Sequence, residues 1–112
     1  MSDVPTIRRS LKIKTGSANR LLKEHNLYRK EAEAQQLKLD KFKADENSEA
    51  WDINNGTRMM EEANKMIADS DARLGKAVAD LRELVIAAKK IPELTEAEEL
   101  LKAEEALEST GI

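Results

Sequence analysis

The chain of 112 residues contains no cysteine, two prolines, four glycines, one histidine and one each of Trp, Tyr and Phe. The absence of cysteine excludes disulfides and thiolate chemistry, and it fits a reducing compartment. The longest purely apolar run is Leu84–Ala88, far short of the ~20 residues that cross a bilayer. We therefore expect no membrane span, and the aromatic content of 3% indicates a thin apolar core.

Known catalytic and ligand-binding patterns are also lacking. His25 has no second His or Cys with which to complete a zinc or catalytic site. The paired glutamates at 61/62 and 98/99 lack the Glu-x-x-His pattern of a di-iron bundle, and the scattered glycines form no phosphate-binding loop. We expect no enzyme activity, no catalytic residue, no metal and no cofactor.

Charged residues make up 37% of the chain, and helix formers dominate the remainder. Apolar or small residues recur in steps of four and three along two ladders, which indicates heptad repeats. The first ladder is Ile7, Leu11, Ala18, Leu21, His25, Tyr28, Ala32, Gln35, Leu39 and Phe42, interrupted by Lys14. The second is Ile53, Thr57, Met60, Asn64, Ile67, Asp71, Leu74, Val78, Leu81, Val85 and Ala88.

These ladders predict an all-α protein, an elongated antiparallel three-helix bundle of the spectrin-like or coiled-coil type, in a single domain over residues 1–112. Pro5 suits a first helical turn, so the first helix should run from about residue 6 to 44. The second should span about 49–90, after a polar turn at 45–48, and end before Pro92. Thr95 and Glu98 have capping-box spacing and predict a shorter third helix over about 95–109.

A short turn makes the first two helices antiparallel, and pairing their ladders makes partner residue numbers sum to about 95. This register places His25 opposite Ser70 or Asp71. The third helix can reach back only to about residue 70, so residues 7–25, 70–90 and 95–109 should form a three-helix half. The other half is then a two-helix hairpin, which leaves uncovered apolar side chains at Leu27, Leu37, Met59, Ala63 and Met66.

The formal net charge of -3 conceals a strong asymmetry. Residues 1–30 carry a formal charge of +6, whereas residues 91–112 carry -6. Two interpretations stay open: the basic first segment pairs with the acidic last segment, or it meets a partner with an acidic surface. A basic, acid-poor start also occurs in mitochondrial presequences, but the heptad phase continues through it, and we expect a cytoplasmic protein.

Several segments resemble one family. The run Ser10-Leu11-Lys12-Ile13-Lys14-Thr15-Gly16, with Arg20-Leu21 and Tyr28-Arg29-Lys30-Glu31-Ala32 further on, is similar to the opening helix of tubulin-binding cofactor A. Trp51-Asp52-Ile53, Met66-Ile67-Ala68-Asp69, Arg73-Leu74 and Asp80-Leu81 also fit, over about residues 7–90 in all. Ala68 stands where the family has proline, so we expect a helix that continues through residues 64–72.

The resemblance implies a cytoskeleton-associated chaperone that binds β-tubulin folding intermediates after their release from the cytosolic chaperonin. Because tubulin is acidic, a basic face of the first helix is a reasonable contact. The candidate contacts are the basic residues Lys12, Lys14, Arg20, Lys23 and Lys30, with Tyr28, Leu37, Met59 and Met66 as apolar contacts. Each also has a structural reading, as a solvated helix face for the cations and as core for Tyr28.

Two other classes stay open. A structural coiled-coil adaptor that dimerises through the two-helix hairpin would have the same heptads, although we expect a monomer. A helical nucleic-acid binder could use the same basic residues, but the acidic third helix and the scarcity of aromatics argue against it. We therefore expect β-tubulin as the partner, with neither nucleic acid nor membrane.

Overall fold

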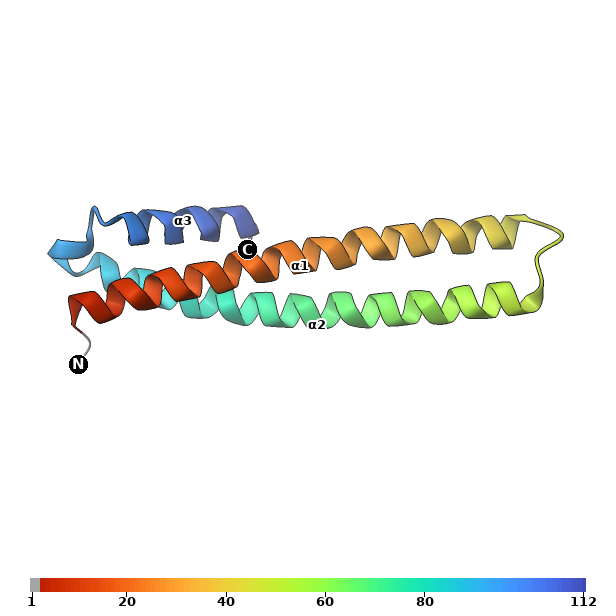
Figure 1. Ribbon diagram of the computed structural model, residues 1–112, viewed down its shortest axis with the longest axis horizontal. Coiled ribbons are helices and arrows are strands. Elements are labelled where there is room, and N and C mark those ends of the chain that lie inside the picture. The colour runs from red at the N-terminus through yellow and green to blue at the C-terminus, as the bar shows by residue number, and fades with distance from the viewer. Residues whose placement is uncertain (1–2) are drawn as a thin grey trace. The chain divides into compact units, whose positions relative to one another are not determined.

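The computed structural model describes residues 3–112, and these contain three α-helices, one short 3₁₀ helix and no strand. The helices are α1 (Val4–Ala44), α2 (Ala50–Lys89) and α3 (Glu98–Thr110), and the 3₁₀ helix η1 (Pro92–Leu94) lies between the last two (Figure 1). The predicted all-α fold, with two long helices and a shorter third, is confirmed.

The chain divides into two compact units, each of which contains parts of α1 and α2. The three-helix unit comprises the chain up to Lys23 together with Ala72–Ile112, and so includes all of α3 (Figure 1). The two-helix unit comprises Glu24–Asp71. The predicted three-helix half included residues 7–25 and 70–90, so the boundaries at Lys23 and Ala72 lie within two residues of the predicted ones.

Side-chain caps set where both long helices begin. The backbone N–H of Thr6 donates to Asp3 Oδ1 at 2.8 Å, which caps α1 and places Pro5 in its first turn. This bonding to Thr6 lowers the pKa of Asp3. At the start of α2, the N–H of Glu49 donates to Asp52 Oδ2, and Asp45 Oδ1 accepts from Asn47 N–H in the preceding turn. Free helical N–H groups are thus satisfied locally.

The core of the three-helix unit draws apolar residues from all its helices. Leu11 of α1, Leu81 of α2, Leu94 of η1 and Leu100 of α3 are almost completely buried. Small residues fill the space between them: Ala18, Ala88, Ala97, Ala103 and Ala106. Alanine lets α3 approach the other two helices closely, and burial of each leucine contributes ~1.5–3 kcal/mol.

The predicted capping box at the start of α3 is wrong. Thr95 Oγ1 donates to the carbonyl of Pro92 instead, which closes the turn of η1. The helix begins three residues later than predicted, at Glu98, and its N-cap residue, Ala97, makes no side-chain cap bond. The buried side chains of Leu94 and Ala97 hold this connection in place of a cap.

The pairing of α1 with α2 in the two-helix unit follows the predicted register. His25 Nδ1 lies 2.7 Å from Ser70 Oγ in a buried contact, and the two residue numbers sum to 95. Gly56 faces Leu39, with the same sum, and a Cβ on Gly56 would lie 3.0 Å from Leu39 Cδ1. Ser70 Oγ also donates to the carbonyl of Ile67 at 3.0 Å, and in this arrangement it accepts from the Nδ1–H tautomer of His25.

The second predicted ladder is wrong at three positions. Thr57, Asn64 and Asp71 are exposed, whereas Gly56 and Ala63 are half-buried and Ser70 is buried. The small residues Gly56, Ala63 and Ser70 are seven positions apart and face α1. Each of them lies one position before the polar residue that was predicted to do so. Large residues at His25 and Leu39 occupy the space that these small side chains leave.

Helix α2 continues without interruption from Ala50 to Lys89, so residues 64–72 are α-helical as predicted. Ala68 keeps the backbone N–H that a proline would remove, and it does not crowd the preceding turn. Alanine, in place of the proline of the family that the sequence resembles, therefore leaves the helix intact.

The buried His25–Ser70 pair leads to a stability prediction. Ser70→Ala removes the acceptor of a buried donor and should lower the free energy of unfolding by ~1–3 kcal/mol, measured by urea denaturation. Replacing both residues, as His25→Leu with Ser70→Ala, should cost less than the sum of the two single changes. The control Ser109→Ala, which removes an exposed hydroxyl that donates to Glu105, should cost less than ~0.5 kcal/mol. Equal losses in Ser70→Ala and the control would contradict this assignment.

A second prediction separates the core from the surface of the three-helix unit. Leu81→Ala should destabilise the protein by ~2–5 kcal/mol because it opens a cavity in the core. Leu101→Ala, at an exposed leucine of α3, should change stability by less than ~0.5 kcal/mol. Thermal and urea unfolding measure the change in stability of each variant. Similar losses of stability in the two variants would argue against the observed orientation of α3.

Candidate partner-binding surfaces

Large apolar side chains are exposed in the two-helix unit, where α3 contributes nothing. Leu27, Leu37, Met59 and Met66 are each at least 40% exposed, as the two-helix hairpin predicts. Trp51, in the first turn of α2, is the most exposed of the large apolar residues at 68%. Ala63 differs from the prediction because it is half-buried against α1.

A groove of about 130 Å³ lies between α1 and α2 in this unit, and its lining is more apolar than polar. Tyr28 and Gln35 line it from α1, and Met59, Ala63 and Met66 line it from α2. Tyr28 and Gln35 are seven residues apart, as are Met59 and Met66, so each pair projects from one face of its helix. The structure thus brings together three predicted apolar contacts: Tyr28, Met59 and Met66.

The two remaining residues that line the groove are Glu31 and Glu62, and neither was predicted to contribute. Each follows a lining residue by three positions, Glu31 after Tyr28 and Glu62 after Met59, which places it on the same helix face. Tyr28 also donates from its hydroxyl to Glu24 Oε1 at 3.0 Å, which fixes the ring beside a further carboxylate. The charged side chains that line this groove are therefore all acidic.

Leu37 and Lys30 do not belong to the groove. Leu37 lies nine residues, or two and a half helical turns, beyond Tyr28, so it points from the opposite face of α1. Lys30 is seven residues before Leu37 and shares that face. Both are exposed, and Leu37 reaches 63%.

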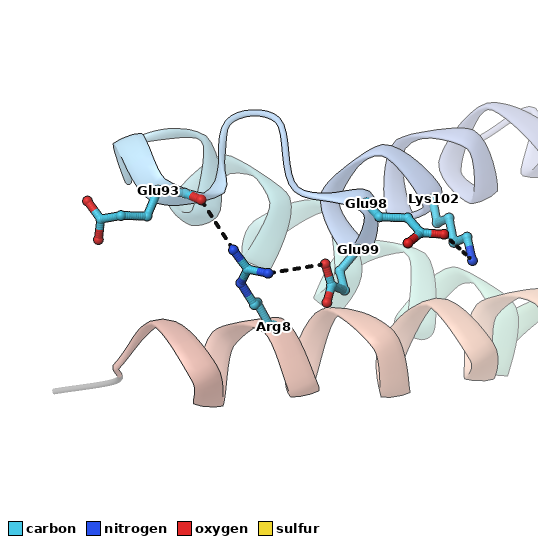
Figure 2. A network of polar contacts seen from close by, with 5 residues as sticks. All are labelled: Arg8, Glu93, Glu98, Glu99 and Lys102. Carbon is cyan, nitrogen blue, oxygen red and sulfur yellow. Dashed lines mark hydrogen bonds and ion pairs between the residues drawn. The ribbon is translucent and has the colours of Figure 1, made fainter.

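The basic start of α1 partly pairs with α3, which supports the structural interpretation of the charge asymmetry for these residues. Figure 2 shows the Arg8 guanidinium between the carbonyl of Glu93, 3.5 Å away, and the carboxylate of Glu99, 3.9 Å away. On the other long helix, Lys89 lies 3.5 Å from Glu104. These contacts are partly exposed and each contributes at most ~1 kcal/mol.

Lys12, one of the predicted partner contacts, lines a cleft with acidic residues of α3. The cleft contains Thr15, Gly16 and Asn19 from α1 and Glu98, Glu99 and Lys102 from α3. Glu98 pairs with Lys102 at 3.0 Å (Figure 2), and this lowers the pKa of Glu98 and raises that of Lys102. The positive charge of Lys12 also lowers the pKa of Glu98. Lys12 thus has both acidic and basic side chains of α3 in its cleft.

The other predicted cations of the three-helix unit differ in exposure. Lys14 is half-buried and shares a cleft with Asp80 and Glu83 of α2. Arg20 and Lys23 are exposed, and in the part of the chain that the structure describes neither takes part in an ion pair. Arg20 and Lys23 are therefore the predicted cations of this unit that are most available to a partner.

The acidic side chains and the single histidine of the described residues do not form a metal site. No group of three or more His, Cys, Asp or Glu side chains within residues 3–112 could hold a metal ion. His25 packs against Ser70, with Nε2 4.0 Å from Asp71. None of the helices between residues 3 and 112 is both long and apolar enough to span a bilayer.

The fold and these surfaces define a helical-bundle binding protein. The family model described as tubulin binding cofactor A matches residues 6–107, and the chain belongs to that family. The chain is 41% identical to tubulin-specific chaperone A of Rattus norvegicus and 43% identical to that of Gallus gallus, in each case over 104 residues and 93% of both chains.

Two solved structures have the same fold. The human tubulin chaperone cofactor A aligns with a TM-score of 0.80 at 37% identity, over 95% of this chain and 99% of that one. Tubulin folding cofactor A from Arabidopsis thaliana aligns with a TM-score of 0.85 at 28% identity, over 94% and 95% respectively. The similarity thus covers α1, α2 and most of α3.

The contact between Glu98 and Lys102 predicts a measurable pKa change. Lys102→Gln removes the cation that most favours the ionised carboxylate, so the pKa of Glu98 should rise toward its ordinary value of 4.5. A pKa that is lower in the folded state than in the unfolded state stabilises the fold at pH values above the unfolded-state pKa. This stabilisation is lost as the pH falls through the folded-state pKa. Carboxyl-detected NMR titration measures the change.

Lys89→Gln, which removes a pair to Glu104, is the matched control and should leave the Glu98 titration unchanged. If Lys102→Gln also left it unchanged, the pair at 3.0 Å would not form in solution.

Proposed function

We propose that this protein is a non-enzymatic tubulin-folding chaperone of the cytoplasm, which binds β-tubulin folding intermediates after their release from the cytosolic chaperonin. Family membership over residues 6–107 is the observation that carries the proposal. The relatives that resemble it along nearly their whole length are named tubulin-specific chaperones.

The distribution of side chains supports a chaperone that works by surface contact. In the two-helix unit, apolar side chains are exposed at Met59, Met66 and Leu37, where a folded client or an intermediate could cover them. Methionine is flexible and polarisable, so it adapts to a client whose own surface is not yet fully packed. Lys30 offers a charged group in the same unit.

In the three-helix unit, we propose Arg20 and Lys23 as the principal basic contacts. They are exposed, and an acidic client would provide carboxylates for charge-assisted hydrogen bonds. Lys12 and Lys14 contribute less, because the carboxylates of α3 and α2 already lie beside them. We expect a monomer to bind one client.

Reversing the charge of Arg20 and Lys23 tests this proposal. Arg20→Glu with Lys23→Glu should weaken binding to purified β-tubulin about a hundredfold at low salt, because like charges would face each other at the interface. Much of the loss should be in the association rate, and the dependence on salt should weaken. Biolayer interferometry at several salt concentrations measures both, and circular dichroism checks that the helices are intact.

The matched control is Lys41→Glu with Lys43→Glu, which reverses two exposed lysines in the last turn of α1 and changes the net charge equally. It should reduce affinity by less than about threefold, since distant exposed charges act weakly through solvent. Unchanged affinity of the Arg20/Lys23 variant would mean that this basic face is only solvated. Absence of any β-tubulin binding by the wild-type chain would overturn the proposed function itself.

A further inference from the structure

The groove of the two-helix unit combines two properties that the proposed function does not use together. Apolar or aromatic side chains line it at Tyr28, Met59, Ala63 and Met66, while the charged side chains that line it are Glu31 and Glu62. Met59 and Met66 are 40% and 43% exposed, so their apolar surface is available to a partner. A complementary occupant therefore combines apolar side chains with basic ones that can reach Glu31 and Glu62.

From these observations we propose that the groove binds an amphipathic α-helix of the client, with an apolar stripe against Tyr28, Met59 and Met66 and Lys or Arg side chains beside Glu31 and Glu62. The proposal rests on the proposed function for the identity of the client, and it names the chemistry of the segment that the client supplies.

The spacing of the lining residues suits side chains that project from a helix lying along the groove. The lining residues lie at a spacing of seven on both walls, which is two helical turns and ~10 Å along each helix axis. A third helix that packs along two others places one side chain in the groove about every turn, at i, i+3 or i+4, and i+7. The methionines can adjust to apolar side chains of different shape.

Charge distinguishes this occupant from a second copy of the same chain. In a symmetric dimer through the groove, the same surface patch faces itself, so the carboxylates of Glu31 and Glu62 would be brought close to those of the other copy. Like charges brought together in this way oppose association. A helix with a basic edge instead gains charge-assisted hydrogen bonds at the same positions.

The first experiment uses the full-length protein with ¹³C-methyl methionine and two synthetic helical peptides of about 18 residues. Both have the same leucine stripe, but one has lysine on its flanks and the other glutamate. We expect the lysine peptide to bind at least tenfold more tightly and to shift the methyl signals of Met59 and Met66. Met60, which does not line the groove, is the internal reference and should shift less.

The double variant Glu31→Lys with Glu62→Lys should reverse the preference between the two peptides. Binding of neither peptide, equal binding of both, or a preference that the variant leaves unchanged would overturn the proposal. Methionine signals that shift with the protein's own concentration, together with a dimer in analytical sedimentation, would assign the groove to a second copy and would also overturn it.

The second experiment tests the groove against the client. Met59→Lys with Met66→Lys should weaken binding to purified β-tubulin at least tenfold. Ile86→Lys with Leu101→Lys is the matched control: it also converts two exposed apolar residues into lysines, in the three-helix unit, and should change affinity less than twofold. Equal effects of the two variants, or no effect of either, would overturn the proposal while leaving the proposed function intact.

If the wild-type chain binds no β-tubulin, the proposed function fails, and the client in our proposal fails with it. The peptide titration still decides the chemistry of the groove, because it needs neither tubulin nor a variant that folds. The two failures are therefore distinguishable.

Discussion

The third helix has 13 residues, whereas α1 and α2 have 41 and 40, and this difference in length determines which apolar side chains are buried. A helix pair buries one stripe of each helix, and a third helix is needed to cover the flanking positions. Helix α3 does so only in the three-helix unit, where Leu11, Leu81 and Leu100 meet in one core. In the two-helix unit the flanking positions stay exposed, and there they form the groove.

A small core requires other means to specify one pairing of the helices. The His25–Ser70 contact supplies one, because a shift of either helix would bury two polar groups without partners. Close packing of Gly56 against Leu39 supplies another, since a larger residue at position 56 would collide with the leucine. The first contact is between polar side chains, and the second buries Leu39, which is only 4% exposed, against a glycine. The register thus does not depend on the exposed methionines, which are free to serve a partner.

Some charges of the chain pair within the fold, and others are the contacts that we propose for a partner. At the start of α1, Arg8 contacts the segment around α3, and Lys12 lies beside Glu98, so part of the basic excess is balanced within the three-helix unit. Arg20 and Lys23 lie beyond these contacts and stay exposed. The basic segment thus divides: the pairs within the fold and the proposed contacts with a partner fall on different residues of one helix.

Heptad spacing predicted two long helices and the pairing of His25 with Ser70 or Asp71, and Pro92 with the segment after it predicted a shorter third helix, because side-chain periodicity, helix breakers and loop length are properties of the chain itself. The family resemblance, too, was present in linear motifs such as Trp51-Asp52-Ile53, where Asp52 proves to cap α2. These features need no knowledge of distant contacts. They are local in sequence or follow from one register.

Tertiary structure alone decided which of two adjacent residues of α2, at 56/57 and at 63/64, faces α1. Gly56 and Ala63 lie nearer the seam than Thr57 and Asn64, because the space beside α1 there is small, and the size of that space depends on both helices. Thr95 turned to the carbonyl of Pro92 because burial of Leu94 and Ala97 sets the path into α3. Likewise, Glu31 and Glu62 became groove residues only when the antiparallel packing placed them on facing walls. A sequence pattern identifies the residues that share one face of a helix. A surface formed by two helices exists only after the helices pack.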